Sequence, residues 1–145
     1  MKALTICQPY PFLILASADE LPPDVEQKRV ENRTWEMLYR GPLLIHAGKS
    51  KKYLKGWDTT KFPPLDFGAI VGMVTVLDCF SFGQITEHTL HPRIAKNFPW
   101  LPKHQHTEGP FCIVMAHPRR FAKPIPYTGR LGLFDVPMDV VKDQV

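Results

Sequence analysis

The sequence predicts a small α+β domain, built as a closed or half-closed mixed β-barrel with few helices. Five or six short apolar runs, bounded by proline and glycine, are typical of strands joined by tight turns. Proline occurs 15 times in 145 residues, about twice its usual frequency of roughly 5%. Because each proline ends or kinks a helix, this frequency disfavours a helical bundle. The length and the 44% hydrophobic content suit a single domain over residues 1–145.

The first half of the chain is expected to hold three strands and one short helix. Residues 3–7 form an apolar strand, which a proline-containing turn ends. Residues 12–16 are apolar and follow a proline, so they suit a short buried helix. Residues 17–27 contain two adjacent prolines and four acidic residues, and we expect an exposed loop there. Strands are predicted again at residues 30–35 and, after a Gly-Pro pair, at residues 43–47.

The middle of the chain is expected to supply the central strand. Residues 49–56 suit a short basic helix, and residues 61–66 a proline-containing connection. Residues 69–80 form the longest apolar run, rich in Val and Ile, which is typical of a strand buried on both faces. Gly72 within this run marks a bulge or a close approach of another backbone.

The last part of the chain is expected to complete the barrel. Residues 86–97 are predicted to be helical in part, with an interruption at Pro92. Residues 111–116 form a further buried strand that ends before Pro118. Residues 129–136 supply a closing strand.

What the sequence lacks excludes several classes of protein and of site. No stretch approaches the roughly 18 to 20 apolar residues of a membrane span, and the N-terminus has no signal-peptide core. The three cysteines are odd in number and lie in apolar runs, so we expect buried, reduced thiols without disulfide partners and a cytoplasmic location. No cofactor motif, Cys-x-x-Cys pair or paired-histidine spacing occurs, and neither a metal nor a cofactor is expected.

Positive charge is concentrated in one segment. The net charge is +4, yet residues 28–61 carry nine basic and three acidic side chains, which is +6 in 34 residues. A basic segment on a nearly neutral body is typical of proteins that bind nucleic acids or nucleotides. A solvated, lysine-rich face without a partner is the alternative, and the sequence leaves both open.

The segment from Val30 to Trp35 carries the clearest sign of a pocket. On a strand, alternate residues share a face, so Glu31, Arg33 and Trp35 are expected to point in one direction. A carboxylate, a guanidinium and an indole make a poor core face, but they suit a wall that stacks and hydrogen-bonds a planar ligand. An exposed edge strand with a surface ion pair is the alternative.

Three further residues are candidates for contacts with a ligand. Gln8 lies where the first strand ends, and its amide can donate to and accept from the edge of a base. Tyr10 offers a ring for stacking. A solvent-facing turn glutamine and a core tyrosine are the alternatives, and the sequence leaves them open. His46 lies on an otherwise apolar strand, where a histidine is more often a hydrogen-bonded core residue than a catalyst.

Several segments, in order along the chain, resemble the ASCH domain family, a branch of the PUA-like superfamily. The similar segments are residues 2–6 (KALTI), 8–10 (QPY), 28–35 (KRVENRTW), 39–49 (YRGPLLIHAGK), 68–72 (GAIVG), 124–126 (PIP) and 129–134 (GRLGLF). The resemblance runs from Lys2 to about Pro137. It implies a small PUA-like mixed β-barrel with a few flanking helices and a central cleft.

The resemblance also implies a function. Proteins of this superfamily bind RNA or modified bases, some ASCH members are amidohydrolases acting on N4-acylated cytidine, and others are reported to cleave RNA. In the small amidohydrolases the chemistry resides in a Lys, a Thr three residues later and a separate Glu, with an Arg two residues after the Thr. Lys28 and Arg33 match the first and last of these positions, whereas Glu31 stands where the family has Thr.

We therefore expect a pocket for a modified pyrimidine nucleobase or nucleoside, and a metal-independent amidohydrolase that removes the acyl group from N4-acylcytidine-type substrates. Glu31 would act as general base on a water, and Lys28 would stabilise the oxyanion or protonate the leaving amine. A non-catalytic module that binds RNA or a modified base is the alternative, followed by a ribonuclease. The residues expected to contact the substrate are Gln8, Pro9, Tyr10, Arg33, Trp35, His46 and Glu108.

Overall fold

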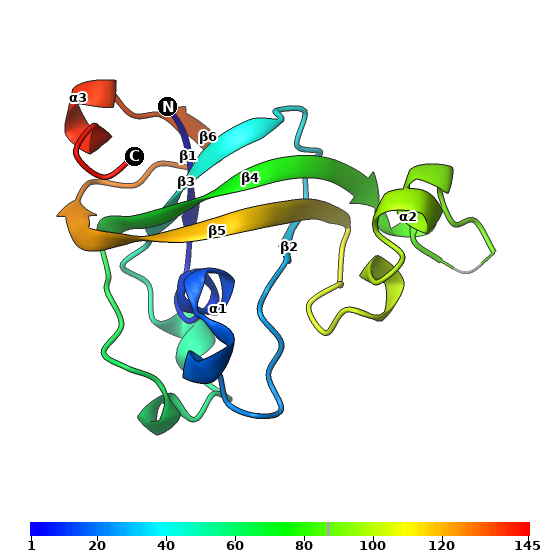
Figure 1. Ribbon diagram of the computed structural model, residues 1–145, viewed down its shortest axis with the longest axis horizontal. Coiled ribbons are helices and arrows are strands. Elements are labelled where there is room, and N and C mark those ends of the chain that lie inside the picture. The colour runs from blue at the N-terminus through cyan, green and yellow to red at the C-terminus, as the bar shows by residue number, and fades with distance from the viewer. Residues whose placement is uncertain (87) are drawn as a thin grey trace.

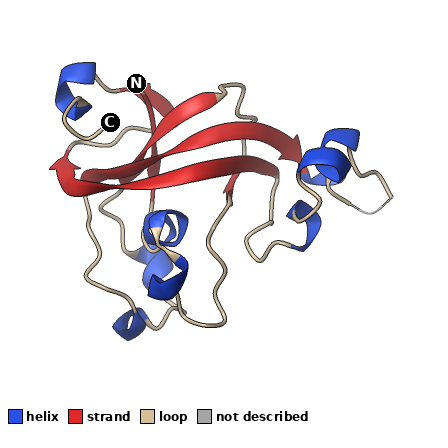
Figure 2. Ribbon diagram, in the orientation of Figure 1, coloured by secondary structure: helices blue, strands red, loops and turns tan. Residues whose placement is uncertain are grey.

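Six strands build one curled sheet in the form of a half-barrel, and a few short helices lie around it (Figures 1 and 2). The computed structural model describes residues 1–86 and 88–145. The strands are β1 (Lys2–Ile6), β2 (Val30–Arg33), β3 (Gly41–Ala47), β4 (Ala69–Ser81), β5 (Phe111–Pro126) and β6 (Leu133–Asp135). The helices are α1 (Tyr10–Leu15), α2 (Pro92–Asn97) and α3 (Met138–Val141), with 3₁₀ turns at Ala18–Glu20, Lys52–Leu54, Thr59–Lys61, Phe82–Gln84 and Leu101–Lys103. The predicted α+β class and barrel-like sheet are confirmed.

The sheet is mixed, and its longest strands occupy the middle. The strand order is β2-β5-β4-β3-β1-β6. Strands β1 and β3 run parallel, and every other neighbouring pair runs antiparallel. Strand β4 pairs with β3 on one side and β5 on the other, so its predicted central position is confirmed. The curl brings the short edge strand β2 below the long strands (Figure 1).

Two buried clusters hold the elements that carry the site. The larger cluster joins α1 to β1, β3, β4 and β5, with Ile14, Leu4 and Ile45 among its members. A second cluster joins β2 and β5 to α2 through Val30 and Ile94. Helix α1 and strand β2 are therefore both anchored in apolar packing. This packing gives rigid support to the polar residues that lie on β2 and just before it.

Gly72 is both a bulge and a point of close approach, as the sequence predicts. The register against β5 shifts between Ile70 and Gly72. A Cβ atom added at Gly72 would lie 2.6 Å from the carbonyl oxygen of Arg119 and 2.7 Å from Leu15 Cδ1. Glycine is therefore needed where helix α1 packs closely on the sheet.

The prediction that Pro118 ends the fifth strand is wrong, because β5 continues through it to Pro126. The register between β4 and β5 shifts between Met73 and Thr75, opposite His117 and Pro118. His117 has φ 52°, in the left-handed region. Proline is tolerated within a strand at such a bulge, because the ladder needs no N–H from it there.

Other predicted boundaries also moved. Pro92 begins α2 instead of interrupting a helix, and His91 caps that helix by accepting a hydrogen bond from the Arg93 backbone N–H over 3.0 Å. Residue 87, in the predicted segment 86–97, lies outside the described residues. The predicted basic helix at 49–56 is only a single 3₁₀ turn, and the closing strand begins at Leu133.

The cysteines occupy different environments. Cys79 and Cys112 are buried free thiols, as expected, whereas Cys7 is partly exposed. Burial raises the pKa of Cys112 to about 11, which keeps this thiol protonated at neutral pH. None of the described helices has the length and apolar character that crossing a membrane requires.

Candidate functional site

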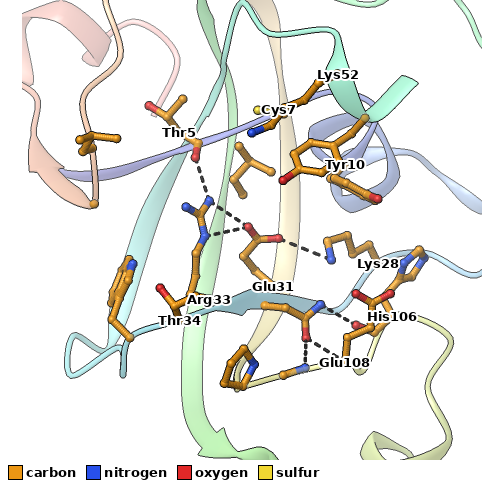
Figure 3. A pocket seen from close by; sticks show the side chains of 18 of the residues that line it. Thr5, Cys7, Tyr10, Lys28, Glu31, Arg33, Thr34, Lys52, His106 and Glu108 are labelled. Atoms are coloured by element: carbon orange, nitrogen blue, oxygen red, sulfur yellow. Dashed lines mark hydrogen bonds and ion pairs between the residues drawn. The ribbon is translucent and has the colours of Figure 1, made fainter. Parts of the chain in front are cut away.

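A pocket of about 790 Å³ lies along β2 and beneath the 3₁₀ turn Lys52–Leu54. Its lining comes from five segments, within residues 5–10, 28–35, 52–57, 105–110 and 130–132. Its volume falls in the range typical of pockets for small molecules. Figure 3 shows charged and aromatic side chains from these segments pointing toward one another.

Three charged side chains form a continuous chain along one wall of the pocket. Lys28 Nζ lies 3.5 Å from Glu31 Oε1. Arg33 Nε donates to Glu31 Oε2 over 3.0 Å, and Arg33 Nη2 forms an ion pair with the same oxygen at 2.9 Å. Arg33 Nη2 also donates to the Thr5 carbonyl oxygen over 2.8 Å, which ties the chain to β1. The Glu31 carboxylate is thus held between two cations (Figure 3).

Strand β2 and helix α1 position this chain. Glu31 and Arg33 are two residues apart on β2, which pairs with β5, so both project toward the pocket. The Lys28 backbone N–H donates to the Leu13 carbonyl of α1 over 2.9 Å. The Lys28 and Glu31 side chains are only 4% and 8% exposed. Burial lowers the pKa of Lys28, and the Glu31 carboxylate offsets this effect only in part.

Aromatic rings form the opposite wall. Tyr10 packs against Tyr53 and Trp57, with ring centroids 5.8 and 6.3 Å apart. Lys28 Nζ lies 5.0 Å from the centre of the Tyr10 ring. Burial raises the pKa of Tyr10, so its hydroxyl remains a neutral hydrogen-bond donor. Trp35, at the far end of the β2 segment, adds another indole to the lining.

Asn32 attaches a distant segment to the pocket. Its Nδ2 donates to the His106 carbonyl over 2.8 Å. Its Oδ1 accepts from the backbone N–H groups of Glu108 and Gly109 over 3.0 and 2.9 Å. These bonds place Glu108 and His106 on the same side of the pocket as Lys28 (Figure 3).

His106 is a buried histidine that its burial, together with the neighbouring charge of Lys28, keeps neutral. Its side chain is 6% exposed, and Nε2 has no hydrogen-bond partner among residues 1–86 and 88–145. Burial, followed by the positive charge of Lys28, lowers the pKa of His106 to about 4. At neutral pH the imidazole therefore adds no charge to the pocket.

The structure brings six of the predicted site residues to this one pocket, namely Tyr10, Lys28, Glu31, Arg33, Trp35 and Glu108. Asn32 and Thr34 also contribute to the lining, although strict alternation would turn them away. For Thr34 the reason is that β2 ends at Arg33, so the alternation does not continue beyond it. Asn32 lies within β2 and borders the pocket where its side chain bonds the segment from His106 to Gly109.

Three predicted residues do not line the pocket. Gln8 is buried, with Nε2 donating to the Asp66 carbonyl over 2.9 Å and Oε1 accepting from the Phe12 N–H over 3.2 Å. Pro9 precedes α1 as its N-cap residue. His46 bonds to Thr5 Oγ1 over 3.1 Å and to the Tyr127 carbonyl over 2.7 Å, and burial lowers its pKa. The side chains of Gln8 and His46 stabilise the fold, because each is already hydrogen-bonded to other parts of the chain.

Sequence reasoning missed the contribution of the segment from Lys52 to Trp57. Lys52, Tyr53 and Trp57 line the pocket, so the basic segment reaches it directly. The signal that could have found them is the interleaving of aromatic residues with lysines, a pattern of nucleic-acid and nucleotide sites. His106 was not among the residues expected at the pocket, and among the described residues no group of three or more His, Cys, Asp or Glu side chains is placed to hold a metal ion.

The chemistry of the pocket has to be inferred from its own residues. A buried ammonium, a carboxylate and a guanidinium lie in sequence along one wall, and aromatic rings face them. Such a site binds a planar polar ligand by stacking and polarises a carbonyl placed beside the ammonium. No protein-family model matches the chain, and it has no significant match among curated proteins.

Proposed function

We propose that the chain is an ASCH-type domain of the PUA-like class, and that its pocket hydrolyses the acyl group of an N4-acylated cytosine base or cytidine. The observation that carries the proposal is the buried Lys28–Glu31 pair at a pocket of about 790 Å³. Among the described residues, Glu31 is the only ion-pair partner of Lys28, so the ammonium keeps donors for a ligand. A buried cation beside a carboxylate is suited to stabilising an oxyanion and to moving protons.

The aromatic wall supports recognition of a base. Tyr10 and Trp35 offer flat surfaces on which any nucleobase stacks. Within the part of the chain that the structure describes, Arg33 uses Nε and Nη2 in contacts with the protein, which leaves Nη1 for the acceptor edge of a cytosine ring. The base would then stack on one of these rings, with its acylated amine toward Lys28.

The pair supplies both proton transfers of the hydrolysis. Glu31 Oε1 takes a proton from a water molecule, and the resulting hydroxide attacks the acyl carbon. Lys28 stabilises the oxyanion and then donates a proton to N4 as the carbon–nitrogen bond breaks. The proton on Glu31 returns to Lys28 across the 3.5 Å gap. The net reaction consumes water and releases a carboxylic acid and the free amine of cytosine.

The surroundings of Lys28 suit the role of acid. Burial lowers its pKa, so the ammonium gives up a proton more readily than an exposed lysine does. A lysine in water has a pKa of about 10.4 and is a weak acid at neutral pH. The same burial strengthens its attraction to a developing negative charge.

A non-catalytic module that binds RNA or a modified base is the second candidate. The observation that favours it is the position of Lys52 at the pocket, because this residue belongs to the basic segment 28–61. In this case the pocket would hold a base without turnover, and the lysines would contact phosphates.

Incubation of the pure protein with N4-acetylcytidine tests the proposal, with the release of cytidine followed by chromatography. We expect turnover that survives excess EDTA and that is lost in Lys28→Met, while Lys55→Met remains active. Binding of cytidine without any turnover would support the non-catalytic module. Turnover that EDTA abolishes and added zinc restores would contradict the metal-independent mechanism.

A further inference from the structure

The positive charges of the side chains that line the pocket outnumber the negative charges. Four are cationic and two are carboxylates, which leaves +2 if all are ionised; they are Lys28, Arg33, Lys52, Arg130, Glu31 and Glu108. Lys28 and Arg33 both contact Glu31. Across residues 1–86 and 88–145, the side chains of Lys52 and Arg130 form neither ion pairs nor hydrogen bonds with other described residues. Two cations at the pocket are thus unmatched by a protein carboxylate.

Lys52 lies beside the aromatic wall. It begins the 3₁₀ turn Lys52–Leu54, and the next residue, Tyr53, packs its ring against Tyr10. Lys52 Nζ is 4.9 Å from the centre of the Tyr53 ring. Figure 3 shows the Lys52 side chain extending over the pocket toward Cys7. Its ammonium is therefore available to a group that projects from a base stacked on Tyr10.

Arg130 lies on a loop that the fold holds in place. The loop joins β5 to β6, and His46 Nε2 is bonded to the Tyr127 carbonyl at its start over 2.7 Å. Gly129 packs so tightly that an added Cβ would lie 2.6 Å from Thr5 Oγ1. His46 and Gly129 thus fix the base of the loop, and the exposed Arg130 side chain borders the pocket from it.

A neutral acylated nucleoside gives these two cations nothing to bind. Building on the proposed function, we propose that the ligand of this pocket is a nucleoside monophosphate, whose phosphate is contacted by Lys52 and Arg130. Ammonium and guanidinium groups are the side chains that proteins use for phosphate. A positively lined cleft also concentrates anionic ligands. The pocket of about 790 Å³ leaves space for a phosphate beyond the base and sugar.

A single phosphate suits the site better than a polymer does. An RNA strand needs cations that continue along its backbone. Lys55 and Lys61 would extend such a track, but neither lines the pocket. Two cations match the charge of one terminal phosphate.

Calorimetric titration of the wild-type chain with cytidine and with cytidine 5′- and 3′-monophosphate tests the inference without requiring turnover. At low salt we expect at least one monophosphate to bind about tenfold more tightly than cytidine, the gain of one or two charge-assisted hydrogen bonds. Lys52→Gln and Arg130→Gln should each reduce this ratio, and the double variant should bring it close to one. Lys55→Gln, which removes the same charge outside the pocket, should leave the ratio unchanged.

The possible results separate this inference from the proposed function. Equal affinity for cytidine and both monophosphates would overturn the phosphate site and leave the hydrolase proposal standing. Absence of binding to all three ligands, together with no turnover of N4-acetylcytidine, would overturn the proposed function itself. A short RNA that binds far more tightly than either monophosphate, with a steep salt dependence, would replace the mononucleotide by a polymer.

Discussion

Lys28 Nζ and Glu31 Oε1 face each other across 3.5 Å in the pocket wall, and both side chains are less than one-tenth exposed. The pair is asymmetric, because Glu31 also accepts a hydrogen bond from Arg33 Nε and forms an ion pair with the same guanidinium, whereas Lys28 has no second ion-pair partner among the described residues. Removing the carboxylate therefore affects two cations, and removing the ammonium affects one anion that keeps its other partner.

This asymmetry predicts unequal effects on stability. Glu31→Gln should lower the free energy of unfolding by about 3–5 kcal/mol, since it leaves buried positive charge uncompensated. Lys28→Met should lower the free energy of unfolding by clearly less. Methionine keeps the apolar stem of the side chain, and the Glu31 carboxylate keeps its contacts with Arg33. Urea denaturation at neutral pH measures both values. An equal loss in the two variants, or a larger loss in Lys28→Met, would show that Arg33 does not hold the carboxylate.

The same pair predicts non-additive kinetics. If Glu31 and Lys28 act on one transition state, each single variant should lower kcat for N4-acetylcytidine by about 100-fold or more. The double variant should be little slower than either single variant, as with residues that act as a unit. Circular dichroism at the assay temperature shows whether each variant is folded.

Glu108→Gln is the matched control for the base. Glu108 is the other carboxylate at the pocket, and it is exposed and outside the charged chain. We expect this variant to retain most of the wild-type kcat. If it instead loses turnover and Glu31→Gln does not, the role of base moves to Glu108.

His106 predicts a loss of stability in mild acid. Burial and the charge of Lys28 lower its pKa from 6.5 to about 4, so the unfolded chain binds more protons between these values. The stabilising contribution is present above pH 6.5 and is lost as the pH falls toward 4. The upper limit of this contribution is about 3.5 kcal/mol, at roughly 1.4 kcal/mol per pKa unit. His106→Phe keeps a ring that does not titrate, and its unfolding free energy should change less over this interval.

Gly72 predicts a steric effect in the sheet. In Gly72→Ala the new methyl group would meet the Arg119 carbonyl at 2.6 Å, so either β5 or α1 must shift. We expect a loss of about 1–3 kcal/mol in the free energy of unfolding. Gly83→Ala is the control, because none of the described residues lies within 4 Å of its added Cβ. Thermal unfolding of both variants measures the difference, and similar melting temperatures would contradict the close approach.

Local patterns along the chain predicted part of the site. The alternation of Glu31 and Arg33 on one strand places both side chains at the pocket, as expected from the geometry of β-structure. Lys28 was predicted because it matches the lysine position of the family that the sequence resembles. The predictions for Glu31 and Arg33 needed only the spacing of neighbouring residues, which a single sequence contains.

Hydrogen-bond and strand partners that are distant along the chain could not be predicted from such local patterns. Gln8 and His46 are polar and looked available, yet each is bonded within the fold, to Asp66 and to Tyr127 respectively. Nothing near Gln8 in the sequence indicates that a carbonyl 58 residues away will face its amide. The strand ending predicted at Pro118 was wrong for the same reason, because the bulge depends on the partner strand.

The sequence by itself determined the α+β class, the central apolar strand and the charged face of residues 31 and 33, because these follow from composition and from the two-residue period of a strand. The tertiary structure alone decided that Lys52, His106 and Arg130 come to the same pocket. Loops that are far apart in sequence meet there through sheet curvature and through the hydrogen bonds of Asn32 and His46. These contacts join residues that are far apart in the sequence, so they form only when the sheet folds and curls.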